Sequence, residues 1–101
     1  MLNDQKQLNL LGLATRARLL VSGEEIVLAE VKKKRATLVI IATDVSDNTK
    51  KKIIDKCHYY KVPYKEQFTT AYISHAIGKK RSICAFIDGG FANSYQKLDM
   101  S

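Results

Sequence analysis

The sequence predicts an α/β fold in which one β-sheet carries helices on both faces, forming a three-layer α/β/α sandwich. Helical and strand-like patterns alternate along the whole chain, which is typical of this class. The chain has 101 residues, the size of one ordinary domain. Its composition, 46% hydrophobic and 27% charged, is that of a globular protein. We therefore expect residues 1–101 to form a single domain whose core needs neither disulfides nor a metal.

The first third of the chain predicts a helix, a short strand and a second helix. Residues 4–14 predict the first helix, because leucines recur there at helical spacing. Residues 18–22 are an extended segment that ends at Gly23. Residues 24–34 predict the second helix, whose acidic start and basic end both suit the helix dipole.

The clearest strand covers residues 38–42, a continuous aliphatic run rich in β-branched residues. Such a run suits a strand that is buried on both faces. The polar turn that follows, over residues 43–47, offers N-cap residues to a third helix over about residues 49–59. The next strand begins with residues 62–64 and lies near a sheet edge, because Pro63 cannot donate a ladder hydrogen bond.

The last third predicts two helices with a strand between them. Thr69 or Thr70 can cap a short fourth helix, and Gly78 is a natural stop for it. The last strand covers residues 82–87, and a glycine-rich turn then leads into a final helix over about residues 91–98. The order of the strands in the sheet does not follow from periodicity.

No pattern in the sequence predicts catalysis, a nucleotide loop or a metal site. The segment from Gly78 to Ser82 is not a P-loop, because the first glycine of that motif would fall on Ile73. Cys57 and Cys84 lie within apolar patterns, and no C-x-x-C or H-x-x-x-H pair is present to bind zinc. We therefore expect two core thiols and a protein that is not an enzyme, with no cofactor, no metal and no small-molecule substrate.

The expected location is the cytoplasm. No apolar run is long enough to span a bilayer, so no membrane partner is expected. The N-terminus lacks the basic and apolar regions of a secretory signal. Unpaired cysteines within apolar patterns are also typical of a reducing compartment.

The charge of the chain is strongly positive: 17 Lys and Arg oppose 10 Asp and Glu, which gives a formal net charge of +7. A compact domain this basic usually binds a polyanion, most often nucleic acid, although a basic surface can also serve solubility alone. Three basic clusters stand out: Lys32-Lys33-Lys34-Arg35, Lys50-Lys51-Lys52 and Lys79-Lys80-Arg81. We interpret the middle cluster as solvent-exposed side chains at the start of the third helix, without a binding role. The other two flank segments that look like a binding site.

Those segments are SGEEIVL at residues 22–28 and QFTTAYISHAIG at residues 67–78, with ATLVIIATDV (36–45) and CHYYKVPY (57–64) between them. In this order they resemble the L7Ae-type kink-turn-binding ribosomal protein superfamily. The motifs LGLATRAR (11–18) and DGGFAN (88–93) are similar to its bacterial YlxQ-like branch. The resemblance extends over nearly the whole chain, from residue 8 to residue 98.

The resemblance implies a sandwich around a four-stranded mixed sheet. It also implies binding to a kink-turn, a sharply bent RNA element with sheared G·A pairs beside a short bulge. In the family, a turn at a helix N-terminus enters the groove at the G·A pairs, and here that turn contains Gly23, Glu24 and Glu25. A second loop, with Phe68 and Thr69, would cover the bulge. Free N–H groups at a helix start can bind phosphate, and an aromatic ring can stack on an unpaired base.

The chain departs from the family at a few positions of this expected surface. Glu24 stands where many relatives have Asn, and Leu28 stands where they often have Lys. In the fourth helix, Ile73-Ser74 replaces a usual Leu-Gly pair. These changes remove one amide and one positive charge, and they add a carboxylate near the phosphates.

We therefore predict a monomeric, ribosome-associated RNA-binding protein whose partner is an RNA of the kink-turn type, ribosomal RNA included. The alternative is a protein-interaction module on the same fold, without direct RNA readout, because a fold does not determine a function. The predicted RNA-binding residues are Gly23, Glu24, Glu25, Leu28, Lys32, Lys33, Phe68, Thr69, Lys79, Lys80 and Arg81.

Overall fold

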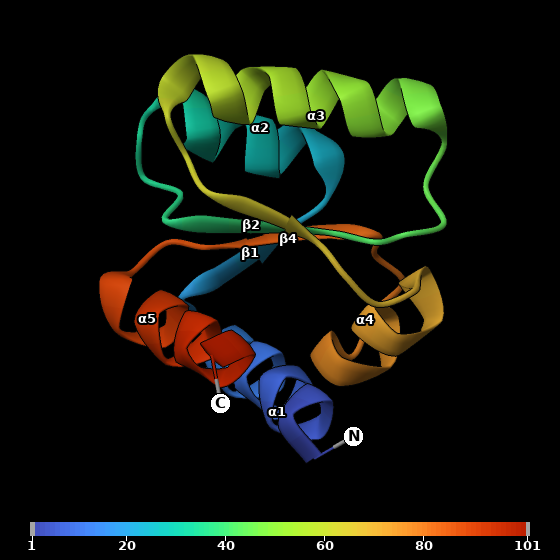
Figure 1. Cartoon of the computed structure of the whole chain (residues 1–101), viewed down its shortest axis with the longest axis vertical. Helices are drawn as coiled ribbons and strands as arrows, with labels where there is room; N and C mark the ends of the chain where they lie inside the picture. The colour runs from blue at the N-terminus through green and yellow to red at the C-terminus, as the bar shows by residue number, and fades with distance from the viewer. Residues whose placement is uncertain (1, 101) are drawn as a thin grey trace.

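The computed structural model describes residues 2–100, which form a sandwich of three layers (Figure 1). The central sheet has the strand order β1-β4-β2-β3. The strands β1 (Leu20–Ser22) and β2 (Leu38–Ile41) both run antiparallel to β4 (Ile83–Phe86), whereas β3 (Tyr64–Glu66) runs parallel to β2. The predicted three-layer fold with a four-stranded mixed sheet is therefore confirmed. Residues 1 and 101 of the predicted domain lie outside the described residues.

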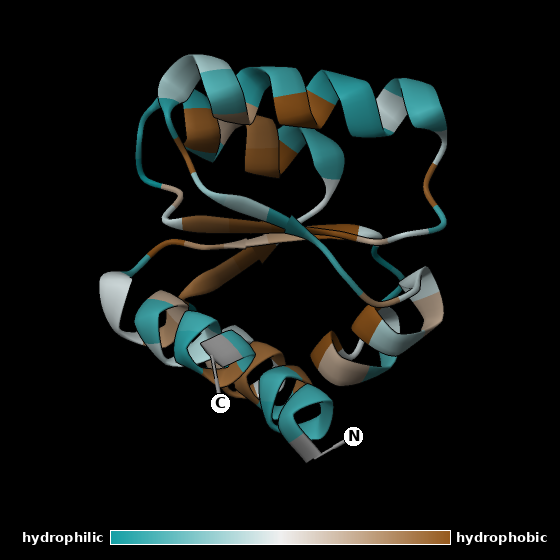
Figure 2. Cartoon of the chain, in the orientation of Figure 1, coloured by the Kyte–Doolittle hydropathy of each residue, from teal (hydrophilic) through white to brown (hydrophobic). Residues whose placement is uncertain are grey.

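Helices cover both faces of this sheet (Figure 1). One face carries α1 (Leu2–Arg16), α4 (Thr70–Ile77) and α5 (Gly89–Lys97). The other carries α2 (Glu24–Lys32) and α3 (Asp47–Tyr60). The buried residues of α2, Val27, Leu28 and Val31, pack against the sheet and α3. Figure 2 shows that the outer side of α3 is hydrophilic. None of the helices within residues 2–100 combines the length and the apolar character that crossing a membrane requires.

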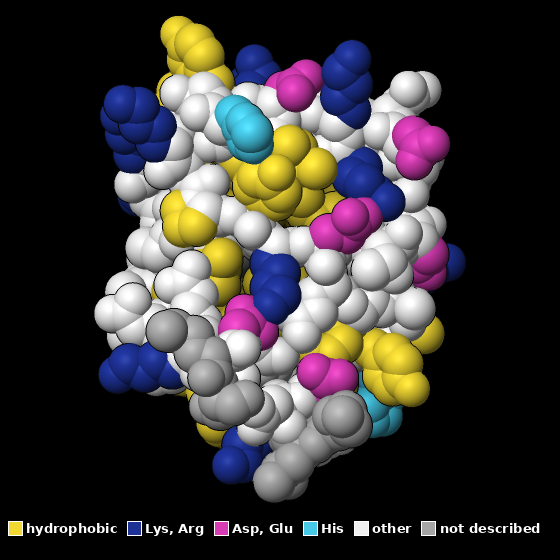
Figure 3. All heavy atoms as spheres, in the orientation of Figure 1, with side chains coloured by type: hydrophobic (Ala, Val, Ile, Leu, Met, Phe, Trp, Pro, Cys, Tyr) yellow, Lys and Arg dark blue, Asp and Glu magenta, His cyan; other side chains and the backbone are white. Residues whose placement is uncertain are grey.

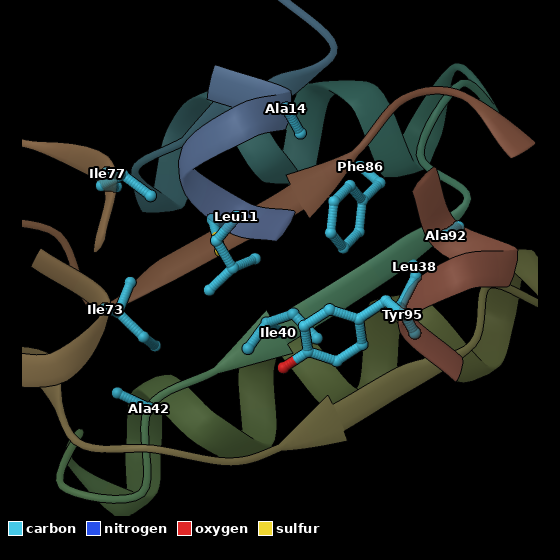
Figure 4. Packing of buried hydrophobic residues seen from close by; sticks show 11 residues of the cluster. Leu11, Ala14, Leu38, Ile40, Ala42, Ile73, Ile77, Phe86, Ala92 and Tyr95 are labelled. Carbon is cyan, nitrogen blue, oxygen red and sulfur yellow. The ribbon is translucent and has the colours of Figure 1, made fainter. Parts of the chain in front are cut away.

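The sheet separates two hydrophobic clusters, and β2 contributes to both. Leu38 and Ile40 pack with α1, α4 and α5, whereas Val39 and Ile41 pack with α2 and α3. Figure 4 shows the first cluster, in which side chains from the three helices converge on those of β2 and β4. All four residues of β2 are buried, so the prediction of a strand buried on both faces is confirmed. Burial of each such side chain contributes roughly 1.5–3 kcal/mol.

Local side-chain chemistry sets most helix ends. Ser46 caps α3, and its oxygen accepts from the Thr49 N–H, so α3 starts two residues earlier than predicted. Thr69, one of the two predicted caps, caps α4. Gly78 ends that helix with φ 83°, as expected. Asp88 caps α5, which therefore begins at Gly89 and not at residue 91.

Further predicted boundaries were wrong because the chain turns earlier or later than its pattern suggests, and β1 starts at Leu20 and not at residue 18. The helix α2 ends at Lys32 and not at residue 34, because Lys34 adopts a left-handed conformation with φ 58°. The strand β3 starts at Tyr64, because the Val62 N–H still bonds to the carbonyl of Cys57 at the end of α3. The predicted edge position of this strand is confirmed. A short 3-10 helix (Leu98–Met100) follows α5.

Candidate nucleic-acid interface

One edge of the sheet gathers the segments that the sequence singled out. The register pairs Ser22 with Cys84, and it pairs Ile41 with both Ile83 and Glu66. The C-terminal ends of β1, β2 and β3 therefore meet the N-terminal end of β4 at the same edge. We call this the loop edge; it comprises residues 22–25, 43–46, 67–70 and 79–82.

The start of α2 lies at the loop edge without a side-chain cap. Its N-cap residue, Gly23, has φ 99° and ψ 143° and forms no side-chain hydrogen bond to the helix. Its own N–H donates to the carbonyl of Ile83 at 2.9 Å, which ties the turn to β4. The N–H groups of the first turn have no intrahelical partner and carry the positive end of the helix dipole. Glu25 and Ile26 beside them are exposed. This helix start can therefore receive a phosphate or a base acceptor.

Glu24 does not present a free negative charge at this turn. Its Oε2 atom lies 2.8 Å from the Nζ atom of Lys52, at the start of α3. The hydrogen bond to Glu24 raises the pKa of Lys52. The neighbouring Lys50 forms an ion pair with Glu66 at the end of β3. Both lysines thus lie beside the loop edge, and the positive charge of Lys52 adjoins the start of α2.

A hydrogen-bond network joins three segments of the loop edge. The N–H and hydroxyl of Thr70 donate to Oδ1 of Asp44 at 2.9 and 2.7 Å. The Thr70 hydroxyl also lies 2.9 Å from the hydroxyl of Ser82. The two hydrogen bonds from Thr70 lower the pKa of the Asp44 carboxyl. The starts of α3, α4 and β4 are therefore held together before any ligand arrives.

The loop at Phe68 is strained and anchored. Phe68 has φ 67°, a conformation that residues with side chains seldom adopt. Its carbonyl accepts from the Thr43 N–H at 2.8 Å, and its ring is half-buried against the cluster beneath α1, α4 and α5. Only part of the ring is therefore available to stack on a base. Thr69 accepts a hydrogen bond from the Tyr72 N–H and so serves mainly as the cap of α4.

A chain of side-chain hydrogen bonds supports this loop from below. The amide of Gln67 donates to Oε1 of Gln7 in α1 at 2.7 Å. The hydroxyl of Tyr95 in α5 donates to the amide oxygen of Gln67 at 2.8 Å. Tyr95 is fully buried, which raises its pKa and keeps the hydroxyl a donor. The terminal helices α1 and α5 therefore position the residue that precedes Phe68.

Arg81 lies directly beside the start of α2. Its Nε atom is 3.6 Å from the position that a Cβ atom on Gly23 would occupy. Its backbone is fixed on Ser74: the Arg81 N–H donates to the Ser74 hydroxyl at 2.9 Å, and this hydroxyl donates to the Arg81 carbonyl at 3.0 Å. Arg81 and the exposed Lys80 line one groove with Gly23 and Glu24. A guanidinium and a helix start thus converge on one point of the surface.

The sequence model of the ribosomal protein L7Ae/L30e/S12e/Gadd45 family matches residues 5–95 of this chain. The chain belongs to this L7Ae family. Among its relatives are the RNA-binding protein YlxQ of Enterococcus faecium, 46% identical over 96 residues (95% of this chain, 93% of that protein), and the RNA-binding protein YlxQ of Bacillus subtilis (strain 168), 53% identical over 90 residues (88% of this chain, 90% of that protein). The resemblance inferred from the sequence is confirmed.

Solved structures agree with the L7Ae assignment. A Bacillus halodurans C protein of unknown function superposes with a TM-score of 0.90 at 41% identity, covering 95% of this chain and 98% of that one. The 15.5kD RNA binding protein of Giardia lamblia superposes with a TM-score of 0.81 at 19% identity, covering 97% of this chain and 85% of that one. At that lower identity, the likeness shows the shared fold alone.

The structure brings most of the predicted site residues of this L7Ae-family chain to the loop edge or directly beside it. They are Gly23, Glu24, Glu25, Phe68, Thr69, Lys79, Lys80 and Arg81. Leu28, which was also predicted, does not reach the loop edge: it is only 8% exposed and packs between α2 and the sheet with Val27 and Val31.

Lys32 and Lys33 are also separated from the loop edge. Lys32 is the last residue of α2 and Lys33 is its C-cap; Lys32 lies eight positions after Glu24, or about 12 Å along the helix axis. Conversely, sequence analysis missed Lys50 and Lys52, which it interpreted as part of a solvated helix start. The alternation of strands and helices could have indicated their position. Helices that follow strands of the same direction start at the same edge of the sheet, so the start of α3 lies beside that of α2.

The two cysteines are core thiols, as predicted. Both are buried and free. Burial raises the pKa of Cys57 to about 11 and that of Cys84 to about 12. Within residues 2–100, no group of three His, Cys, Asp or Glu side chains is placed to hold a metal ion.

Proposed function

We propose that this chain is a single RNA-binding domain over residues 1–101 that recognises a kink-turn or a similarly bent RNA at its loop edge. One observation carries the proposal: Arg81 lies beside the uncapped start of α2 at Gly23, and Lys52 forms an ion pair with the first residue of that helix, Glu24. Membership of the L7Ae family and the names of the two relatives, both called RNA-binding proteins, support it. We further propose that the protein is cytoplasmic, monomeric and associated with the ribosome.

The proposed site combines two kinds of contact. The N–H groups of α2, together with Arg81 and Lys52, attract phosphate through the helix dipole and full positive charges. Glu25 is exposed and has no ion-pair partner among residues 2–100. Its carboxylate is therefore free to accept hydrogen bonds from the N1 and N2 groups that a G·A pair leaves on guanine. Glu24 is the carboxylate that this chain has in place of the usual Asn. Because Lys52 forms an ion pair with it, Glu24 repels phosphate less than a free carboxylate would.

Preorganisation favours a bent RNA over a regular duplex. The contacts of Asp44 with Thr70, and of Gln67 with Gln7, hold the loop at Phe68 in one arrangement. A loop that is already ordered loses less conformational entropy on binding. The exposed part of the Phe68 ring can then stack on a nucleotide of the bulge.

The test compares a kink-turn RNA with a duplex of equal length and composition, at one fixed salt concentration. We expect the wild type to prefer the kink-turn. Glu25→Ala should weaken kink-turn binding by about 1–3 kcal/mol, the scale of a base-edge contact, and leave duplex binding unchanged. Arg81→Gln should weaken both RNAs equally, because it contributes charge. Lys6→Gln, on the exposed side of α1, is the matched charge control.

Two results would contradict the proposal. Equal affinity of the wild type for kink-turn and duplex would refute recognition of the bend. Unchanged or tighter kink-turn binding by Glu25→Ala would show that its carboxylate only stabilises the start of α2. Co-sedimentation with ribosomes, and sedimentation of the free protein, test the ribosome association and the monomeric state.

A protein-interaction role is the second candidate, and one observation favours it. Leu13 and Tyr72 are 46% and 61% exposed and line a groove between α1 and α4. Exposed apolar patches commonly mark contacts with other proteins. If this groove carried the function, Leu13→Ser combined with Tyr72→Ser would abolish it in cells, whereas Arg81→Gln would not.

A further inference from the structure

A second basic surface lies at the end of the molecule opposite the loop edge. The helices α2 and α3 both start at the loop edge and run away from it, so their C-terminal ends lie together (Figure 1). Val31 and Ala36, on either side of the end of α2, pack in the same cluster as Cys57 and Val62, on either side of the end of α3. The two turns that leave these helices are thus adjacent. Their exposed side chains form what we call the distal basic surface, which consists of Lys32, Lys33, Lys34, Arg35, Tyr59 and Lys61.

The positive charges of the distal basic surface are largely uncompensated. Lys32, Lys33, Lys34 and Lys61 are exposed, and none of them forms an ion pair with a residue in the range 2–100. Arg35 alone is paired, with Glu30 at 2.8 Å. Figure 3 shows basic side chains beside a protruding hydrophobic side chain at this end of α3, at the upper left. The surface therefore attracts a polyanion.

Two of these lysines occupy strained backbone positions. Lys34 and Lys61 both have φ 58°, in the left-handed region that glycine adopts freely. At the end of α4, the corresponding left-handed position is occupied by Gly78, with φ 83°, and a glycine adopts this conformation without strain. A lysine can interact with the helix dipole from the last helical turn, as Lys32 does, without this strain. Strained residues that persist at an exposed site point to a function for the side chain.

An aromatic ring completes the surface. Tyr59 is 77% exposed, whereas tyrosine is usually buried to an intermediate degree. Its ring packs edge-on against Tyr60, with centroids 4.8 Å apart and planes at 77°. This contact fixes the ring while leaving it accessible. Exposed aromatic rings among basic residues are the usual platform for unpaired bases.

We propose that the distal basic surface is a second RNA-binding site, which contacts phosphates through its lysines and stacks one unpaired base on Tyr59. The loop edge lies at the N-terminal ends of α2 and α3 and the distal basic surface at their C-terminal ends, so the two sites lie at opposite ends of the molecule (Figure 1). One protein molecule then holds two RNA segments at the same time. The role of the loop edge in this arrangement rests on the function proposed above, whereas the distal site does not depend on it.

The experiment saturates the protein with unlabelled kink-turn RNA and then titrates a labelled oligouridine of about 15 nucleotides. We expect the oligouridine to bind this complex. Lys34→Gly combined with Lys61→Gly should weaken its binding at least about fivefold and lower the salt slope by about 1.4, which corresponds to two phosphate contacts on a single strand. Kink-turn affinity should not change. Tyr59→Ala should weaken oligouridine binding without changing the slope.

Two controls separate charge from folding. Lys6→Gln combined with Lys97→Gln removes the same charge from the opposite helical layer and should leave oligouridine binding unchanged. Because glycine suits the left-handed conformation, the glycine variant should unfold at the same or a higher temperature than the wild type. When thermal unfolding shows this, loss of binding in that variant does not come from unfolding.

Two outcomes overturn the second site. Displacement of oligouridine by the kink-turn RNA would mean that both RNAs share one site. The second outcome is that the glycine variant binds oligouridine as tightly as the wild type does. An acidic protein partner for this surface would give that second outcome. Failure of the loop-edge proposal would give a different set of binding results. Kink-turn and duplex would then bind equally, while the glycine variant would still bind oligouridine more weakly than the charge control does.

Discussion

Replacing Gly23 by alanine tests how much the backbone conformation at the start of α2 contributes to stability. Gly23 has φ 99° and ψ 143°, a region that is populated almost only by glycine. A Cβ atom there would lie 3.6 Å from Nε and 3.9 Å from Cδ of Arg81, which are ordinary van der Waals distances. No steric overlap follows, so the destabilisation comes from the backbone alone.

The expected loss of stability is about 1–2 kcal/mol. A residue with a side chain held in such a conformation costs about 1–3 kcal/mol, and the lower entropy of the unfolded alanine chain offsets about 0.4–1 kcal/mol of this. For a domain of this size, each kcal/mol lowers the melting temperature by about 4–8 °C. We also expect weaker RNA binding, because the free N–H groups of α2 would be reoriented.

Chemical denaturation with two further glycine variants checks this reasoning. Gly78→Ala places a side chain in a left-handed position with no atom within 4 Å, so it should cost about 1 kcal/mol. Gly89→Ala adds a methyl group in open space at an ordinary φ, so it should be neutral or stabilising by up to about 1 kcal/mol. If Gly23→Ala were as stable as Gly89→Ala, the argument from backbone conformation would be refuted.

The remaining predictions concern charge and burial. Lys52→Gln should weaken RNA binding several-fold, because it removes a cation and frees the charge of Glu24; adding Glu24→Gln should recover part of the loss, as affinity measurements at fixed salt would show. The lowered pKa of Asp44 contributes stability above the ordinary value of 3.8, and this contribution is lost as the pH falls through the folded-state pKa. Denaturation from pH 6 down to about pH 3 should therefore show a flatter decline for Asp44→Asn than for the wild type. With pKa values of about 11 and 12, Cys57 and Cys84 should react with a thiol reagent near pH 8 only after denaturation, and rapid labelling of the native protein would contradict their burial.

The sequence by itself determined the elements that depend on neighbouring residues. The aliphatic run at residues 38–41 predicted a buried strand, because a short continuous run rich in β-branched residues suits a strand that is covered on both faces. Thr69 or Thr70 marked the start of α4 and Gly78 its end, since a side-chain cap and a left-handed glycine act within one helical turn. The motifs of the L7Ae family were recognisable for the same reason, as each is a local pattern.

The tertiary structure decided which of these motifs share a surface. The strand β4 pairs antiparallel with both β1 and β2, so β1 and β2 point the same way and the helices that follow them start at the same edge. This arrangement joins Lys52 to Glu24 and places Lys32 at the far end of the molecule. Pairing of strands that are distant in sequence leaves no trace in local periodicity. The sequence therefore predicted the turn at Gly23, whereas only the packed sheet decided which charges surround it.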